Sequence, residues 1–366
     1  MRRTLLSLSL VLLLARISFG QANEETQRQA APVDAYQMGW QPRNAMSEAE
    51  LWRQLSEQSP RDVNSQFNWY RSERNARLDR NNGQLSSTDR QELERIAEKV
   101  EAADANSFES HMTGYYADFP APQAFTSLRA AAVLGPDRQE LIAPMLNLAH
   151  MSGDKGAQDT WTRALDTQGI LSPAYLQAAS DLLLSVDRDG ILFTNGDMDT
   201  HPLLVLQRRK DERRDVLLVD QRLLADAQYR QRIWSEARAK GPVPGAGTVF
   251  ARTLTTATDR PVFLAMGMDR SWLDAFEGRL STSGTAFRIG AGLSMAQLDE
   301  RWKLMKKPTG AGPLSRNYLL PGAVLLKAAR AKGDEARSAQ LELELRRMAR
   351  ALGAEQDLLK AGVLQH

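Results

Sequence analysis

Apolar residues recur at helical spacing over the first half of the chain. The pattern is clearest after Thr88 and Gln91, which form a capping box, a pair of side chains that satisfies the first backbone N–H groups of a helix. The apolar residues that follow fall at i, i+3, i+4 and i+7 and share one face: Leu93, Ile96, Ala97 and Val100. Patterns of this kind predict a helical domain at residues 46–186.

From about residue 106 the expected helices shorten and come in pairs. Residues 124–137 carry alanines seven apart followed by Leu and Pro, as the closing helix of a tetratricopeptide repeat does. A second pair is expected on either side of a turn at Gly153 and Asp154, and a further helix starts at Ser172. Stacked pairs bury a shared core, so we expect TPR-like repeats. Because the period is kept loosely, an irregular helical bundle stays an alternative.

Near residue 187 the pattern changes to short apolar runs. Those that predict buried strands cover 190–194, 215–220 and 260–266, with an edge strand at 285–289. Helices are expected between the strands, at about 201–210, 221–239 and 270–278. This alternation indicates a small, mainly parallel, Rossmann-like sheet in a domain at 187–292.

The last part of the chain, residues 293–366, returns to helices. Helices are predicted at 294–305, 317–332 and 335–352. The last two form a hairpin around Gly333, and we expect this part to pack on the α/β domain. The predicted fold class is therefore mixed α and α/β, with helical TPR-like repeats, then a small Rossmann-like parallel sheet, then a C-terminal helical hairpin.

The first 20 residues are expected to be a secretory signal peptide. Arg2 and Arg3 precede an apolar run from Leu5 to Ala15, and small residues precede a cleavage site after Gly20 or Ala22. The run is about half of the roughly 20 residues that a membrane span needs. Residues 21–45, polar and without an apolar period, are expected to form a flexible leader. The mature protein is then periplasmic or otherwise secreted, with no stable membrane insertion.

Composition narrows the classes of function. The 366 residues include 47 basic and 45 acidic side chains, four histidines and no cysteine. Thiolate metal sites, disulfides and cysteine nucleophiles are therefore excluded, and a multi-histidine metal centre is not expected. Removing residues 1–20 takes away three arginines and no acid, which leaves 44 basic against 45 acidic residues. Such a balance argues against a nucleic-acid partner, which needs a basic face.

The strongest candidate chemistry follows the first predicted strand. Its polar residues are Thr194, Asn195, Asp197, Asp199, Thr200 and His201. Open α/β sheets place ligands at the carboxyl ends of their strands, and Asn195-Gly196 permits a tight turn. The two aspartates offer the oxygen ligands that Mg²⁺ or Ca²⁺ prefers, so Asp197 and Asp199 are the metal candidates, if a metal is bound at all. The alternative stays open that both carboxylates only cap the following helix, with Thr200 as a further capping candidate.

This segment also resembles a known family. Residues 191–207 read Ile-Leu-Phe-Thr-Asn-Gly-Asp-Met-Asp-Thr-His-Pro-Leu-Leu-Val-Leu-Gln, and Asp215-Val216 opens a second apolar run that leads to Leu223-Leu224. Together they are similar to the soluble C-terminal region of a membrane family described as protein O-mannosyltransferase-like, and to related secreted TPR-like envelope proteins of gram-negative bacteria. The resemblance covers roughly 190–224 and brings Asp215 into the candidate site. The chain lacks the membrane-embedded catalytic half of that family, so the resemblance implies no transferase activity.

Other motifs lead to rejected or open assignments. A haloacid-dehalogenase-type phosphatase places its nucleophile directly after the strand, whereas Asn195 and Gly196 intervene here. The Gly-Pro segment at 241–247 lacks the Lys-Ser/Thr of a phosphate loop. No catalytic residue is assigned. We expect an exported, non-catalytic protein that binds a protein or envelope-glycan partner through its helical surfaces and the acidic loop, without a cofactor. The alternative is an enzyme or accessory subunit of envelope glycan modification that uses a divalent cation at Asp197 and Asp199, assisted by His201 or Asp215.

Overall fold

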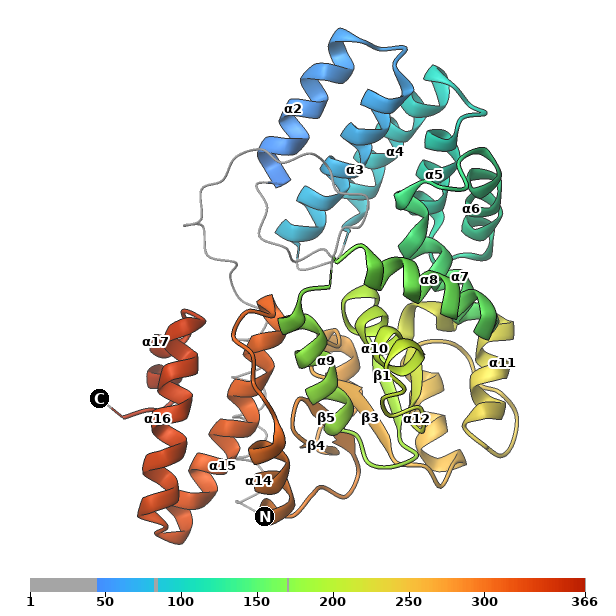
Figure 1. The fold of residues 1–366 in the computed structure, drawn as a ribbon. Helices are drawn as coiled ribbons and strands as arrows, with labels where there is room; N and C mark the ends of the chain where they lie inside the picture. Colours follow the sequence, from blue (N-terminus) through green and yellow to red (C-terminus); the bar gives the residue numbers. More distant parts are fainter. Residues whose placement is uncertain (1–44, 82–84, 170, 366) are drawn as a thin grey trace. The chain divides into compact units, whose positions relative to one another are not determined.

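The computed structural model of the chain describes residues 45–81, 85–169 and 171–365 (Figure 1). This part of the chain forms two compact units, which divide between Leu165 and Asp166. The predicted signal peptide at 1–20 lies outside the described residues, as does the predicted leader except for Ala45. None of the described helices is long and apolar enough to cross a membrane.

The first unit is built from helices. They are α2 (Ala45–Gln58), α3 (Val63–Arg80), α4 (Ser87–Ala103), α5 (Phe108–Asp118), α6 (Pro122–Leu134), the short 3₁₀ turn η1 (Gln139–Leu141), α7 (Ile142–Ser152) and α8 (Lys155–Thr167). From α2 to α6, each helix packs against the next. Fully buried aromatic residues, among them Phe67, Tyr70 and Phe125, fill the core between them. The period of apolar positions thus predicted helices in this region correctly.

The start of α4 differs from the prediction by two residues. The capping box is formed by Ser86 and Asp89, not by Thr88 and Gln91. The carboxylate of Asp89 also accepts hydrogen bonds from Arg77 and Asn81 at the end of α3. The packing of α3 against α4 therefore selects between two capping signals that are equivalent in the sequence.

The second unit combines helices with one small sheet. Its first elements are α9 (Pro173–Leu184), β1 (Ile191–Thr194), α10 (Asp197–Arg209), β2 (Leu217–Asp220), η2 (Gln221–Ala225), α11 (Ala227–Glu236), α12 (Thr248–Ala257) and β3 (Val262–Ala265). They are followed by α13 (Arg270–Asp274), β4 (Leu280–Thr282), β5 (Ala286–Ile289), α14 (Met295–Leu304), η3 (Gly312–Tyr318), α15 (Leu319–Lys332), α16 (Glu335–Ala351) and α17 (Glu355–Lys360). The described residues are therefore mostly helical, with a mixed α and β architecture.

The five described strands lie in the order β2-β1-β3-β5-β4, and the sheet is mixed. β1 runs parallel to both β2 and β3, while β5 runs antiparallel to β3 and to β4. The prediction of a parallel sheet is therefore wrong for its second half. The short link between β4 and β5, with Gly284 at φ 78°, permits only a hairpin, and it places β5 inside the sheet instead of at its edge.

Helices pack around this sheet within the second unit. α9 and α10 lie against each other, and α15 and α16 form the C-terminal hairpin (Figure 1). The hairpin turns at Gly333, whose φ of 69° is readily adopted by a glycine, as the sequence predicted. The finer assignments, to TPR-like repeats and a Rossmann-like sheet, stay predictions, as do the domain boundaries at residues 186 and 292.

Candidate functional site

The candidate loop follows β1 and runs directly into α10. Thr194 is the last residue of β1, and α10 begins at Asp197, four residues earlier than predicted. Gly196 between them has φ 96°, a conformation that residues with a side chain rarely adopt. A Cβ atom at this position would also lie 2.8 Å from Cζ of Arg222. Two independent constraints therefore require glycine here.

The carboxylate of Asp197 is paired with an arginine inside the fold. Nη2 of Arg222 donates to Oδ1 of Asp197 at 2.5 Å and to Oδ2 of Asp220 at 2.7 Å. Nε of Arg222 donates to the other oxygen of Asp220 at 3.1 Å. Asp220 is fully buried, and the Arg222 side chain is 25 % exposed. One guanidinium thus joins the ends of β1 and β2 through two carboxylates.

The protonation of this cluster follows from its burial. Burial by itself would lower the pKa of Arg222, but the charges of Asp197 and Asp220 hold it well above its ordinary value. His201 is fully buried, with Nε2 3.5 Å from Oδ1 of Asp197. Burial lowers the pKa of His201, so the imidazole is neutral at pH 7. The ion pairs in this cluster are therefore those that Arg222 forms with Asp197 and Asp220.

Asp199 has a separate environment. It is 5 % exposed, and Oδ2 accepts the backbone N–H of Asn195 at 3.2 Å. A Cβ atom on Gly267 would lie 3.2 Å from the same oxygen, so the glycine leaves room for the carboxylate. Burial raises the pKa of Asp199 to about 6, with a smaller contribution from the charge of Asp220.

Asn195 connects the loops that follow β1 and β3. Its side-chain N–H donates to the carbonyl of Gly267 at 2.8 Å and to Asp269 at 3.3 Å. Its side-chain oxygen accepts from Gln221 at 3.1 Å. β2 and β3 lie on opposite sides of β1, so this is the topological switch point at which open sheets bind ligands. Here the polar atoms of the loops bind one another across that point.

The two threonines hold the start of α10 to the sheet. Oγ of Thr194 and Oγ of Thr200 are 2.7 Å apart, and the Thr200 hydroxyl lies 3.4 Å from Asp220. Both residues are fully buried. Thr200 lies inside α10, so the prediction that it caps this helix is wrong, because the helix begins three residues earlier.

The metal prediction depends on whether the two aspartates face a common point. Asp197 binds Arg222 and Asp199 binds the backbone of Asn195. Across the described ranges, no group of three or more histidine or acidic side chains is arranged to hold a metal ion. Asp197 and Asp199 therefore do not form a shared set of ligands in this geometry, and Mg²⁺ or Ca²⁺ binding stays a prediction.

Asp215 lies at the amino-terminal ends of the parallel strands, which we call the amino edge of the sheet, whereas the loop follows their carboxyl-terminal ends, the carboxyl edge. It precedes β2, whereas Thr194 and Asp220 are register partners at the ends of β1 and β2. Its carboxylate accepts two bonds from Arg213, both at 2.9 Å, and these bonds, with a smaller contribution from the Asp189 N–H, lower the pKa of Asp215 to about 2 against the opposing effect of burial. The residue that completes the loop is Asp220. The sequence contained a usable signal for it, because parallel strands end at the same edge of a sheet.

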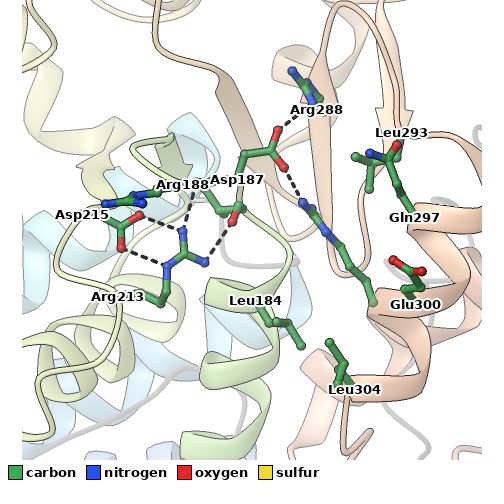
Figure 2. Close-up of a pocket in the computed structure, with 12 residues that line it drawn as sticks. Leu184, Asp187, Arg188, Arg213, Asp215, Arg288, Leu293, Gln297, Glu300 and Leu304 are labelled. Atoms are coloured by element: carbon green, nitrogen blue, oxygen red, sulfur yellow. Dashed lines mark hydrogen bonds and ion pairs between the residues drawn. The ribbon is translucent and has the colours of Figure 1, made fainter.

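A groove lies at the edge where Asp215 is found. It encloses about 800 Å³ and is open to solvent, with walls from the end of α9, the turn before β1 and one face of α14 (Figure 2). We call it the arginine groove, after the four arginines that line it: Arg188, Arg213, Arg288 and Arg301. No sequence pattern predicts this site, because its residues come from segments up to 120 positions apart.

The groove is lined by more positive than negative side chains. Oδ2 of Asp187 accepts from Arg288 at 2.6 Å, and Oδ1 of the same carboxylate is bound by Arg301 (Figure 2 shows the contact with Arg288). Arg213 and Asp215 form a one-to-one pair. The single carboxylate of Asp187 therefore pairs with two guanidinium groups in the groove.

Comparison with known proteins gives one match. A family model described as TMEM260-associated domain 2 matches residues 175–249, about a fifth of the chain. The matched region contains β1, the loop at 194–201, α10 and β2. It overlaps the segment whose resemblance the sequence indicated, but that family is only loosely related to the O-mannosyltransferase-like membrane family and says nothing of TPR-like envelope proteins. No curated protein and no solved structure matches the chain.

Proposed function

We propose that this is an exported, non-catalytic protein that binds a protein or envelope-glycan partner. The observation that carries the proposal is the internal pairing of the polar loop at 194–201. Arg222 binds both Asp197 and Asp220, and Asn195 joins the loops after β1 and β3. A catalytic acid or base must reach a substrate proton, whereas these groups are held by their neighbours within the fold.

The fold supports the same conclusion at a coarser level. Stacked helices such as α2 to α6 offer extended surfaces for a partner, which is the use that TPR-like repeats make of them. In the second unit, the β2-β1-β3 part has the parallel pairing of a Rossmann-like sheet. We propose both assignments, with the α/β unit acting as a binding module.

The alternative, an enzyme or accessory subunit with a cation at Asp197 and Asp199, has less support. The two carboxylates bind different partners, and a cation at Asp197 would compete with Arg222 at 2.5 Å. Calorimetric titration with Mg²⁺ and Ca²⁺ tests this alternative directly. Binding that disappears in the Asp197→Ala, Asp199→Ala double variant would favour it over the proposal.

The proposal itself is tested by export and cross-linking. The full chain, carrying a C-terminal affinity tag, is produced in its native host and the cells are fractionated. We expect a processed form that begins close to residue 21 in the periplasmic fraction. We also expect chemical cross-linking to link it to a reproducible protein or glycan. Retention of the unprocessed chain in the cytoplasm contradicts export, and the absence of any cross-linked partner contradicts the binding function.

A further inference from the structure

We propose that the arginine groove binds an acidic peptide segment of a partner protein. In this complex a carboxylate of the peptide pairs with Arg288, and its neighbouring aliphatic side chains contact the leucines of the groove. The inference rests on the proposed binding function and assigns it a site and a class of partner. The site lies at the edge of the sheet opposite the loop at 194–201.

The arginine groove has an excess of positive charge beside Asp187. Asp187 is shared by Arg288 and Arg301, so this cluster of three side chains carries one uncompensated positive charge. All three are partly buried, with side-chain exposures of 27 % for Arg288, 18 % for Arg301 and 22 % for Asp187. An incoming carboxylate would neutralise the excess in a place where water screens it only in part.

Arg288 and Arg301 differ in how many of their N–H groups are bound within the fold. Both Nη atoms of Arg301 donate hydrogen bonds there, to the carbonyl of Ser185, the hydroxyl of Ser283 and the carboxylate of Asp187. In contrast, Arg288 makes one hydrogen bond to the described residues, through Nη1, although a guanidinium has five N–H groups. Exposed Arg188 makes no hydrogen bond or ion pair with any residue that the structure describes, so it adds positive charge at the rim.

The walls of the groove are partly apolar. Leu184 and Leu293 line the groove together with Leu304, which is 64 % exposed on α14 (Figure 2). Glu300 on the same helix has no ion pair among the described residues. It can accept N–H groups of a peptide backbone and would repel a second acidic group. The groove thus fits one carboxylate flanked by aliphatic side chains.

These surroundings favour a peptide over an acidic sugar. Carbohydrate rings commonly stack on aromatic side chains, and the lining of the groove contains aliphatic and charged residues and one amide, Gln297, but no aromatic residue. An extended peptide offers a carboxylate, aliphatic side chains and backbone N–H groups at short spacing. An anionic glycan is therefore the outcome that the test must separate from the proposal.

The probe is a library of capped, fluorescein-labelled octapeptides. One central position is Glu or Asp, and the two positions on each side vary over Leu, Ile, Val and Ala. A twin library carries Gln or Asn at the central position, and an oligogalacturonate serves as the sugar probe. Binding to the full chain is measured by fluorescence anisotropy for the peptides and by calorimetry for the sugar. We expect the tightest acidic peptides to bind at least tenfold more tightly than their amide twins at 50 mM NaCl. The ratio should shrink at 500 mM NaCl because salt screens the charge.

Matched variants then locate the site. Arg288→Gln removes the excess charge but leaves Asp187 paired with Arg301, and we expect it to weaken the acidic peptide at least tenfold. Leu304→Asp should weaken it to a similar degree, and Arg188→Gln about threefold. The controls are Arg252→Gln, at an exposed position on α12, and Leu343→Asp, at a position 73 % exposed on α16, and neither should change binding. Circular dichroism melting checks that each variant is folded.

Three results would overturn the inference. They are equal binding of acidic peptides and amide twins, no binding by any library member, and tighter binding of the oligogalacturonate than of any peptide. A fourth result separates the inference from the proposed function. If the native partner still cross-links to folded Arg288→Gln and Leu304→Asp proteins as it does to the unchanged protein, the binding function stands and the groove is not its site.

Discussion

The two edges of the sheet use arginine in opposite ways. At the carboxyl edge, one guanidinium serves two carboxylates, because Arg222 binds both Asp197 and Asp220. At the amino edge, one carboxylate serves two guanidiniums, because Asp187 binds both Arg288 and Arg301. The first arrangement has an excess of negative charge, and the second has an excess of positive charge beside an open groove.

This difference shows that the open groove of a sheet need not lie at the strand ends where a ligand is expected. The switch point between β1 and β3 is the place where open sheets usually hold ligands, and here Asn195 fills it with internal hydrogen bonds. The opening lies at the other edge, where α14 and the antiparallel β5 have been added to the parallel strands. The same chemical change at the two edges should therefore have very different effects.

The largest expected effect is that of Arg222→Gln. It leaves the fully buried carboxylate of Asp220 without its partner, and breaking a buried pair in this way costs about 3–5 kcal/mol. Urea denaturation followed by circular dichroism measures the free energy of unfolding. Arg270→Gln, at a side chain 61 % exposed, is the control and should change it by less than about 1 kcal/mol. Equal effects of the two substitutions would show that the carboxyl-edge cluster does not stabilise the fold.

The next effect is a dependence on pH that comes from Asp199. Its folded-state pKa of about 6 lies above the ordinary 3.8, so the folded state holds a proton that the unfolded state releases at lower pH. The stability that this proton gives is present below about pH 4 and is lost as the pH rises to about 6. The loss amounts to about 3 kcal/mol, since one pKa unit corresponds to about 1.4 kcal/mol.

Unfolding free energies of the unchanged protein and Asp199→Asn, measured from pH 4 to 7, test this. The variant should gain about 2 kcal/mol relative to the unchanged protein over that range, because part of the full change falls below pH 4. Asp215→Asn is the control, because the lowered pKa of Asp215, about 2, puts its own pH dependence below this range. Curves that stay parallel for Asp199→Asn would place its folded-state pKa near the ordinary value.

A smaller effect is expected from Gly196→Ala. The substitution combines a φ of 96° with a contact of 2.8 Å to Arg222, and together these should cost about 2 kcal/mol. Gly241→Ala isolates the first contribution, because Gly241 has φ 86° and open space around it, and should cost about 1 kcal/mol. The difference between the two variants in urea denaturation measures the contact with Arg222. If the two costs are the same, Arg222 moves aside freely and its cluster is looser than described.

The smallest effect on stability is expected from Arg288→Gln at the amino edge. Asp187 keeps Arg301 as its partner, so the free energy of unfolding should change by less than about 1 kcal/mol. Both variants are measured in the same urea series, so that the effects of an arginine-to-glutamine change at the two edges can be compared. If Arg288→Gln lowers the free energy of unfolding as much as Arg222→Gln does, the main role of Arg288 is to stabilise the fold and not to bind a partner.

The sequence predicted those parts of the fold that depend on local patterns. The apolar runs at β1, β2 and β3 and the glycine turn at Gly196 were found from neighbouring residues alone. β4 was missed because its three residues are only half-buried and show no apolar run. α12 was missed because it follows a Gly-Pro segment that was taken to be a connector.

The candidate site shows the same limit. Thr194 to His201 were found because they are contiguous, whereas Arg222 completes the cluster from 25 positions away. Asp220 was within reach of sequence reasoning, since parallel strands end at one edge. The contact of Asp187 with Arg301 joins residues 114 positions apart, one in the turn before β1 and the other on α14. Sequence patterns therefore predict single helices and strands better than they predict which side chains from distant segments contact each other.

Arg301 has a mechanical consequence for the groove. Its guanidinium connects α14 to the turn after α9 and to the segment between β4 and β5. This side chain cross-links the two walls of the groove by hydrogen bonds before any partner binds. Binding would then cost little entropy for ordering the walls, so changes in affinity should appear mainly as changes in the dissociation rate of the complex.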